Sequence, residues 1–339
     1  MIELHNVDCM TYMAGLEDNA IDAIITDPPY YKVKGEAWDN QWDSAEGFLE
    51  WVAELLVEFE RILKPNGSLY FFASPKMSAR VEIEISKRFN VLNNIAWRKG
   101  KAGYKEQGWS QKTRKEDLRG FIPQTEKIIF AEHYNSDNQA KGEAGYLTKC
   151  DELRGFVFEP LRAYIRNEFK RAGMLNQQGR KDADKACGVK TMASKHYFDR
   201  SQWQLPTAEH YQALRDLLNT KGGEYLKREY EYLKREYEDL RRPFNVTAKD
   251  QWGDIWEFDP VAAYPGKHVC EKPLPLLAHM LNSSTKPDAL VFDPFAGSGS
   301  MGEACKLTGR NFIGTENCLV NYRKASERLD ALDRQVAMF

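Results

Sequence analysis

The stretch Asp27-Pro28-Pro29-Tyr30 combines residue types that can act together on an amine. Consecutive prolines restrict the backbone, so the Asp27 carboxylate and the Pro28 carbonyl would point in set directions. Both groups accept hydrogen bonds, and neither proline has an amide hydrogen that competes for them. The exocyclic amine of a nucleobase has two hydrogens to donate, and Tyr30 offers a ring on which a base could stack. We predict that these four residues are catalytic.

A second stretch with chemical potential, "VFDPFAGSGSMG", joins a strand, an acid, a loop of small residues and a helix. Gly297, Gly299 and Gly302 match G-x-G-x-x-G, and Glu316 is placed to hold ribose hydroxyls. This pattern alone would permit a nicotinamide dehydrogenase. Asp293 favours another ligand, because a carboxylate would repel a pyrophosphate but would pair with an ammonium. S-adenosylmethionine offers an ammonium, a ribose and a purine.

Hydrophobic periodicity indicates the elements that must position these two stretches. Strands and helices alternate, which predicts an α/β fold with a doubly wound, mostly parallel sheet. Open sheets of this kind bind ligands at the carboxyl ends of their strands, where Asp27 would lie. The expected strands are residues 21–26, 68–73, 91–97, 127–131, 288–292 and 311–316, and the expected helices are 48–63 and 300–307.

The pattern changes between Asp151 and Arg242, where charged residues and helix formers dominate and β-branched runs are few. We therefore expect an inserted helical module that splits the sheet domain. The predicted organisation is a first catalytic part at 1–148, the helical module at 149–245 and a second catalytic part at 246–339.

Composition narrows the class of protein. The chain has 339 residues, of which 42% are hydrophobic, which is ample for a packed core. It contains no run of eighteen apolar residues and does not begin like a signal peptide, so we expect a cytoplasmic protein of a prokaryotic or phage-infected cell. Its six cysteines form no C-x-x-C pair, which argues against a zinc site and a disulfide framework, and no metal is expected.

The net charge of −2 conceals an uneven distribution. Segment 97–115 carries seven Lys or Arg against one acid, and segment 162–200 carries ten against four. Such patches suit a phosphate backbone, although solvated faces explain the charge equally well. Glycines and aromatic residues, among them Trp97, suggest that the first segment is a loop that grips DNA, with a disordered surface loop as the alternative. Its candidate DNA-binding residues are Arg98, Lys99, Lys101, Lys105, Trp109, Lys112 and Arg114.

Residues 179–198 resemble a helix-turn-helix, with the turn at Gly188. Ala183 and Ala186 are small enough for close helix contact, but Asp184 stands where that motif usually has alanine. An unspecialised helical scaffold is the alternative to a DNA-reading module. The candidate DNA-binding residues here are Lys190, Ser194, Lys195 and His196.

The heptapeptide "YLKREYE" occurs twice in succession, at 225–231 and 232–238. Leu226, Tyr230, Leu233, Tyr237 and Leu240 follow a heptad spacing, which predicts one helix with an apolar seam. The seam is short for an independent coiled coil, so packing on its own module is favoured over a homodimer.

"DPPY" at 27–30 followed far downstream by "DPFAGSG" at 293–299 resembles the S-adenosylmethionine-dependent DNA amino-methyltransferases with permuted motif order. In that family D-P-P-Y is associated with N6-adenine and S-P-P-Y with N4-cytosine. "HVCEKP" at 268–273 is similar to the family's H-P-x-x-K-P element but departs at Val269. The resemblance implies a Rossmann-like fold and the cofactor-binding residues Asp8, Asp27, Lys272, Asp293, Pro294, Phe295, Ala296, Gly297, Ser298, Gly299, Glu316 and Asn317.

The resemblance also implies direct methyl transfer to a base flipped out of double-stranded DNA. The absence of a cysteine beside the prolines agrees with this, because a ring-carbon methyltransferase would need a nucleophile there. N4-cytosine is the nearest alternative, since the same acceptors serve either amine. An RNA adenine methyltransferase, a nicotinamide-dependent dehydrogenase and a DNA-binding regulator without enzymatic activity are more remote.

Overall fold

The chain falls into two structural units in a computed structural model, residues 1–133 with 243–339 and residues 134–242. The sequence predicts the corresponding boundaries at 148 and 245. The structure describes residues 1–33, 35–99, 119, 121, 124–133, 158–200, 203–220, 222–246, 250–251 and 253–336, and side chains as far as residue 332.

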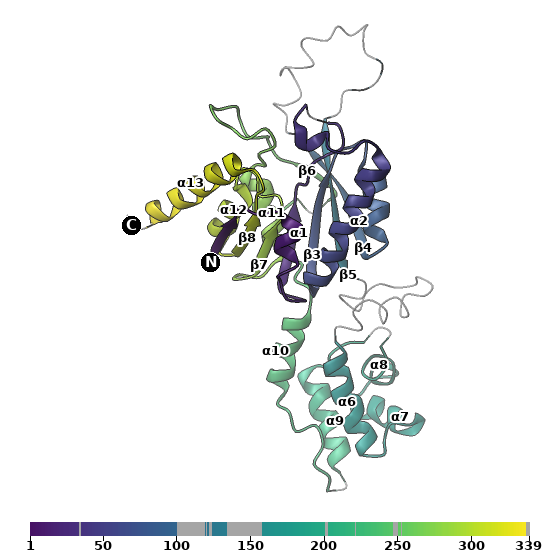
Figure 1. Cartoon of the computed structure of the whole chain (residues 1–339). Helices are drawn as coiled ribbons and strands as arrows, with labels where there is room; N and C mark the ends of the chain where they lie inside the picture. The colour runs from purple at the N-terminus through teal and green to yellow at the C-terminus, as the bar shows by residue number, and fades with distance from the viewer. Residues whose placement is uncertain are drawn as a thin grey trace. The chain divides into compact units, whose positions relative to one another are not determined.

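Strands from both parts of the first unit form one sheet (Figure 1). Within the described residues it has eight strands in the order β1-β8-β7-β2-β3-β5-β4-β6. Strand β5 runs antiparallel to β3 and β4, and the other pairs are parallel, so the predicted mostly parallel α/β fold is confirmed. The strands are β1 Ile2–His5, β2 Ile21–Thr26, β3 Leu63–Ala73, β4 Phe89–Arg98, β5 Thr125–His133, β6 Ile255–Glu257, β7 Leu290–Asp293 and β8 Asn311–Thr315.

Helices cover both faces of this sheet because its central strands are apolar on both sides. Ile24 of β2 packs into the core beneath α1, α2 and α3, whereas its neighbours Ala23 and Ile25 face the core shared with α11 and α12. None of the described helices is long and apolar enough to span a membrane. The helices of this unit are α1 Cys9–Met13, η1 Ala37–Asp39 (a 3-10 turn), α2 Ala45–Ile62, α3 Ser78–Ser86, α11 Leu274–Ser284, α12 Ser300–Thr308 and α13 Leu319–Val336.

Two details of the sheet differ from the sequence prediction. Strand β3 begins at Leu63, directly after α2, because Leu63 already pairs with Ile21 of β2. Trp97, which the sequence places both at the end of the expected strand 91–97 and at the start of the expected DNA-gripping loop, belongs to the strand. It lies within β4, is 2% exposed, and donates a hydrogen bond from its indole nitrogen to the Phe258 carbonyl at 2.9 Å. Alternation along the strand turns its side chain, like that of Ile95, into the core.

The second unit is helical and has its own apolar core. The predicted turn at Gly188 is present, with φ +67°, between α7 and α8. Ala183 is fully buried, but Ala186 is exposed, so its predicted helix contact is wrong. Asp184 is buried and accepts a hydrogen bond from the Ser194 amide at 3.0 Å, which links the two helices. The helices are α6 Glu159–Arg171, α7 Gln177–Ala186, α8 Met192–His196, α9 Ala208–Asn219 and α10 Tyr230–Leu240.

The two identical heptapeptides adopt different conformations. Helix α10 begins only at Tyr230, so the predicted helix across the first copy is wrong. Leu226 has φ +51°, and its amide donates to Glu168 at 2.8 Å while its carbonyl accepts from Arg215. Leu226 and Leu233 are both fully buried in the core of this unit. The homodimer stays a prediction, and these two leucines are not exposed to mediate it.

Candidate active site

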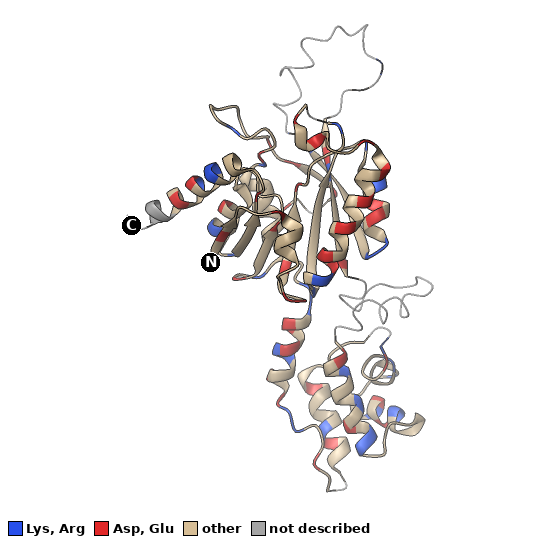
Figure 2. Cartoon of the chain, in the orientation of Figure 1, with Lys and Arg blue, Asp and Glu red and all other residues tan. Residues whose placement is uncertain are grey.

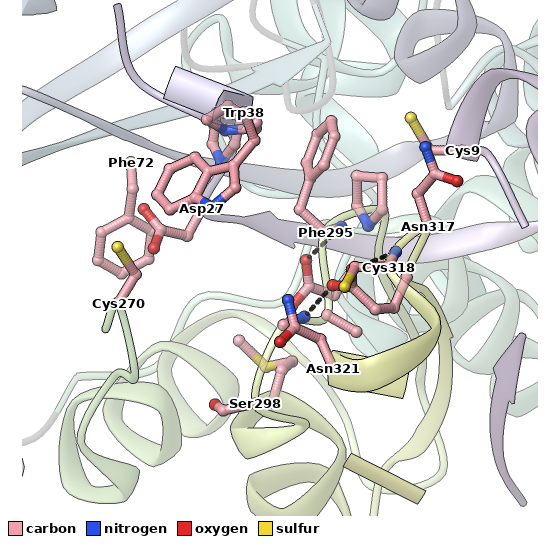
Figure 3. Close-up of a pocket in the computed structure, with 18 of the residues that line it drawn as sticks. Cys9, Asp27, Trp38, Phe72, Cys270, Phe295, Ser298, Asn317, Cys318 and Asn321 are labelled. Atoms are coloured by element: carbon pink, nitrogen blue, oxygen red, sulfur yellow. Dashed lines mark hydrogen bonds between the residues drawn. The ribbon is translucent and has the colours of Figure 1, made fainter. Parts of the chain in front are cut away.

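The carboxyl ends of β1, β8, β7 and β2 meet at one edge of the sheet, where they border a cavity of about 440 Å³. Figure 3 shows side chains from these strand ends turned toward it. All four predicted catalytic residues, Asp27, Pro28, Pro29 and Tyr30, line the cavity. Of the predicted cofactor-binding residues, every one except Gly299 lines it as well. Segments far apart in the sequence therefore share one site.

The loop between β7 and α12 requires glycine at two positions. Gly297 has φ +50°, and a side chain there would bring its Cβ within 3.2 Å of His268. Gly299 has φ +75°, and a Cβ there would lie 3.0 Å from that of Ala325. Other residue types rarely adopt this left-handed backbone, which explains the small-residue pattern. Although Gly299 does not line the cavity, it shapes the turn that precedes α12.

Glu316 follows β8 and is held in place by the backbone. Its Oε2 accepts a hydrogen bond from the Gly297 amide at 3.0 Å, and its Oε1 accepts one from the Cys318 amide at 2.8 Å. Each carboxylate oxygen keeps capacity to accept a second bond, as the ribose hydroxyls would require. Asp8 caps α1 by accepting from the Thr11 amide at 3.1 Å and also lines the cavity.

Asp293 is a buried carboxylate at the end of β7. It is 7% exposed and accepts a hydrogen bond from the Phe295 amide at 3.1 Å. Burial raises its pKa to about 8, and the Phe295 bond only partly opposes this effect. Among the described residues it makes no ion pair. A ligand ammonium beside it would favour the ionised form, so the site suits a cationic group.

Asp27, just past β2, has partners within the protein. The Tyr30 hydroxyl donates to its Oδ1 at 2.6 Å, and the Lys272 ammonium pairs with its Oδ2. Lys272 also lies 3.4 Å from Glu126 of β5. Burial raises the pKa of Asp27, although Lys272 opposes the shift. Lys272, which the sequence predicts to bind the cofactor, thus borders the cavity, but its ammonium is paired with the carboxylate of Asp27.

Sequence reasoning missed three residues that shape the amine side of the cavity. Trp38 and Phe72 line it near Asp27 (Figure 3), and Asp39 is fully buried and accepts a hydrogen bond from the Tyr30 amide at 2.6 Å. The sequence signal that could have identified Trp38 and Asp39 is the adjacent pair "WD", which follows the prolines by a few residues. Phe72 lies inside a strand and carries no local signal.

The predicted DNA-binding residues are only partly described. Arg98 pairs with Glu257, and Lys99 pairs with Glu126 at 2.5 Å, so both charges are locally balanced. In the helical unit Lys190 and Lys195 are exposed, whereas Ser194 and His196 are half-buried. Figure 2 shows further basic residues on α7. Lys101, Lys105, Trp109, Lys112 and Arg114 lie outside the described residues.

Within the part of the chain that the structure describes, no group of three or more His, Cys, Asp or Glu side chains could hold a metal ion.

The doubly wound, mostly parallel sheet with a glycine loop at the carboxyl end of β7 agrees with a Rossmann-like methyltransferase fold. A family model described as DNA methylase, covering N6 and N4 enzymes, matches residues 21–323. The chain therefore belongs to this DNA methyltransferase family. S-adenosylmethionine is the methyl donor of such enzymes, and the predicted cofactor is confirmed at that level.

Curated relatives agree with this assignment. Over 69 residues, 20% of this chain and 25% of the relative, the chain is 46% identical to the Type II methyltransferase M2.MboI of Moraxella bovis. It is 24% identical to the Type II methyltransferase M.HindIII of Haemophilus influenzae over 96% of this chain and 94% of the relative. The short stretch shared with the first relative spans only a quarter of that protein.

Solved structures share the fold. The M1.HpyAVI complex with S-adenosylmethionine superposes with a TM-score of 0.50 at 19% identity, over 97% of this chain and 99% of that one. The PvuII DNA methyltransferase, described as cytosine-N4-specific, gives 0.52 at 11% identity, over 96% and 85%. At these identities the likeness concerns the fold alone.

Proposed function

We propose that this protein transfers a methyl group from S-adenosylmethionine to the N6 amine of an adenine flipped out of double-stranded DNA. The observation that carries the proposal is the shared cavity, which brings Asp27 of the proline-rich stretch beside the glycine loop and Asp293. The side of the cavity formed by the glycine loop and Asp293 suits the methyl donor, and the side formed by Asp27 suits an amine. The preference for adenine rests on the resemblance of the D-P-P-Y motif.

In the proposed cofactor complex, Asp293 pairs with the amino-acid ammonium and Glu316 accepts the ribose hydroxyls. The loop of residues 294–299 brings backbone amides close to the ligand, because its glycines permit tight approach. Asp8 and Asn317 complete the adenosine side of the cavity. These residues bind and orient the donor without taking part in bond making.

The amine of a neutral adenine is a weak nucleophile because its lone pair is delocalised into the ring. Asp27 and the Pro28 carbonyl accept its two hydrogens and so localise that lone pair toward the methyl group, with an attraction that grows as positive charge develops. The amine nitrogen bonds to the methyl carbon as the carbon–sulfur bond breaks, and the electron pair of that bond stays on sulfur. The methylated amine then loses one proton, for which Asp27 is the adjacent base.

An aromatic wall is needed to hold a base that has left its stack. The sequence predicts that Tyr30 provides this wall, and the bond from its hydroxyl to the Asp27 carboxylate holds the ring beside that carboxylate. Trp38 and Phe72 border the same part of the cavity and are further candidates for this wall.

The helical unit, with Lys190, Ser194, Lys195 and His196 on or near α8, is proposed to read the DNA target. Exposed lysines would hold the phosphate backbone, and polar side chains would contact base edges. Residues Arg98 and Lys99 are proposed to support the DNA beside the cavity.

The decisive test is expression in a host free of DNA methylation, followed by genome-wide mapping of modified bases. We expect N6-methyladenine at one sequence motif, and no modification with Asp27→Ala. N4-methylcytosine as the only product would replace adenine by cytosine, the second candidate that the same acceptors serve. Methylation of RNA alone, or motif-specific DNA binding without any methylation, would overturn the proposal.

A further inference from the structure

Two carboxylates share one buried ammonium at the amine side of the cavity. Lys272 contacts Asp27 Oδ2 and lies 3.4 Å from Glu126 Oε2, and its side chain is only 8% exposed. The other oxygen of Glu126, Oε1, pairs with Lys99 at 2.5 Å. When all four groups are ionised, the cluster is neutral, so its charges can rearrange without a change in total charge.

The second carboxylate oxygen of Glu126 can accept a further hydrogen bond. Glu126 Oε2 is buried and has no hydrogen-bond partner within the described residues. A buried acceptor that receives no hydrogen bond is costly, and a charge-assisted bond from an ammonium is ~2.8 Å long, shorter than the 3.4 Å that separates Lys272 from this oxygen. Lys272 would satisfy this oxygen by moving roughly half an ångström toward it. Burial alone would raise the pKa of Glu126, but Lys272 and Lys99 together lower it, so Glu126 stays ionised.

Asp27, by contrast, has both oxygens engaged. The Tyr30 hydroxyl occupies Oδ1 and Lys272 occupies Oδ2. The amine of an incoming base needs a strong hydrogen-bond acceptor. An ammonium bound to the Asp27 carboxylate makes that carboxylate a weaker acceptor. The ammonium also repels the positive charge that develops on the amine during methyl transfer. Asp27 is therefore a better acceptor when Lys272 has moved away.

We propose that Glu126 is a positioning residue that draws the Lys272 ammonium away from Asp27 when the target base enters. The inference rests on the proposed role of Asp27 as acceptor of the amine. It applies to either amine, because the exchange involves the carboxylate and not the identity of the base.

The test is single-turnover methyl transfer from tritiated S-adenosylmethionine to genomic DNA from a methylation-free host. Glu126→Gln keeps the size of the side chain but removes the charge that attracts Lys272. We expect the rate constant to fall roughly 10- to 100-fold, as for a misplaced catalytic group, with cofactor affinity by calorimetry within about twofold of wild type. Glu126→Asp, which restores the charge, should recover part of the rate.

Glu132→Gln is the matched control, since Glu132 is a buried carboxylate near the opposite end of the same strand, where it accepts a hydrogen bond from Asn90 at 3.1 Å. It should leave the rate unchanged. In a double-mutant cycle with Lys272→Met, the Glu126→Gln change should have no further effect, because Glu126 acts through that lysine. A wild-type rate for Glu126→Gln, or additive effects in the cycle, would overturn the inference. Because tritium counts methylation of either base, a cytosine product would overturn only the adenine proposal, and methylation by Asp27→Ala would overturn the role of Asp27.

Discussion

Asp27 and Asp293 occupy equivalent places, just past or at the carboxyl ends of the adjacent strands β2 and β7. Their carboxylates nevertheless have different bonding partners. Asp27 has an ammonium and a hydroxyl bound to it, whereas Asp293 has a backbone amide and, among the described residues, no cation. Burial raises the pKa of both. In the proposed function Asp27 must release its ammonium before it accepts an amine, whereas Asp293, which has no described cation beside it, suits a charged ligand.

The largest effects should come from removing each carboxylate in turn. Asp27→Ala should lower methyl transfer by about 10³-fold or more, because the amine loses its acceptor, while the dissociation constant for S-adenosylmethionine changes little. Asp293→Ala should instead weaken cofactor binding by roughly 100-fold, the scale of one charge-assisted pair. Calorimetry and single-turnover rates measure the two effects separately. Equal loss of cofactor affinity in both variants would contradict the division of roles.

The pH dependence of cofactor binding should sharpen the contrast. With a pKa of about 8, Asp293 is mostly protonated at pH 7 in the ligand-free protein and must ionise to pair with an ammonium. The dissociation constant should fall about tenfold between pH 6 and pH 7, with about one proton released per ligand bound. Calorimetry in buffers of different ionisation enthalpy counts that proton. Asp293→Asn should abolish its release.

The Asp293 carboxyl should also make the folding stability of the ligand-free protein depend on pH. Rising pH strengthens cofactor binding but lowers this stability. Because the folded pKa of Asp293 lies above its unfolded value, its contribution to stability is complete below about pH 4 and is lost as pH rises through 8. Asp293→Asn should therefore raise the melting temperature of the ligand-free protein at pH 8 while it weakens cofactor binding. A lower melting temperature would contradict the raised pKa of Asp293 on which this prediction rests.

The loops that follow the two acids have different backbone requirements. Prolines restrict the backbone after Asp27, whereas glycines permit a left-handed backbone after Asp293. Gly297→Ala would strain a backbone with φ +50° and bring Cβ within 3.2 Å of His268. We expect cofactor affinity to fall roughly tenfold, which corresponds to ~1.4 kcal/mol. Gly253→Ala, where nothing lies within 4 Å of the added Cβ, is the control and should bind normally.

The smallest effect should come from the hydroxyl that holds Asp27. Tyr30→Phe keeps the ring but removes the 2.6 Å bond to Asp27 Oδ1, so the carboxylate is less well oriented. Single-turnover transfer should slow by several-fold to roughly tenfold, with cofactor affinity unchanged. Tyr30→Ala, which also removes the ring, should be slower than Tyr30→Phe. Equal rates for the two variants would argue against a role for the ring.

Much of the fold could be predicted because its signals are local. Strand β2 and the helix after the glycine loop follow from runs of apolar residues and from glycine and proline placement. Strands β1 and β6 escaped prediction because four and three residues carry too little periodicity, and their pairing depends on distant strands. Trp97 fits both the expected strand at 91–97 and the expected basic loop at 97–115, and its burial within β4 decides in favour of the strand.

The repeated heptapeptide shows where local information ends. Residues 225–231 and 232–238 are identical, yet only the second copy lies wholly within α10. Glu168, Arg215 and Tyr211 bond to the backbone of Leu226 in the first copy and hold it outside a helix. Bonds from distant residues outweigh the intrinsic helix propensity, which amounts to less than about 1 kcal/mol per residue.

By itself the sequence determined the fold class, the two chemical motifs and the kind of ligand each suits, because residue type and spacing along a strand or loop are local properties. The tertiary structure alone decided that Lys272 and Glu126 join Asp27, that Asp293 has no described cation beside it, and that Trp38 borders the same cavity. These facts depend on which distant strand ends converge. Convergence is a property of packing, and packing sets the electrostatic differences on which the chemistry depends.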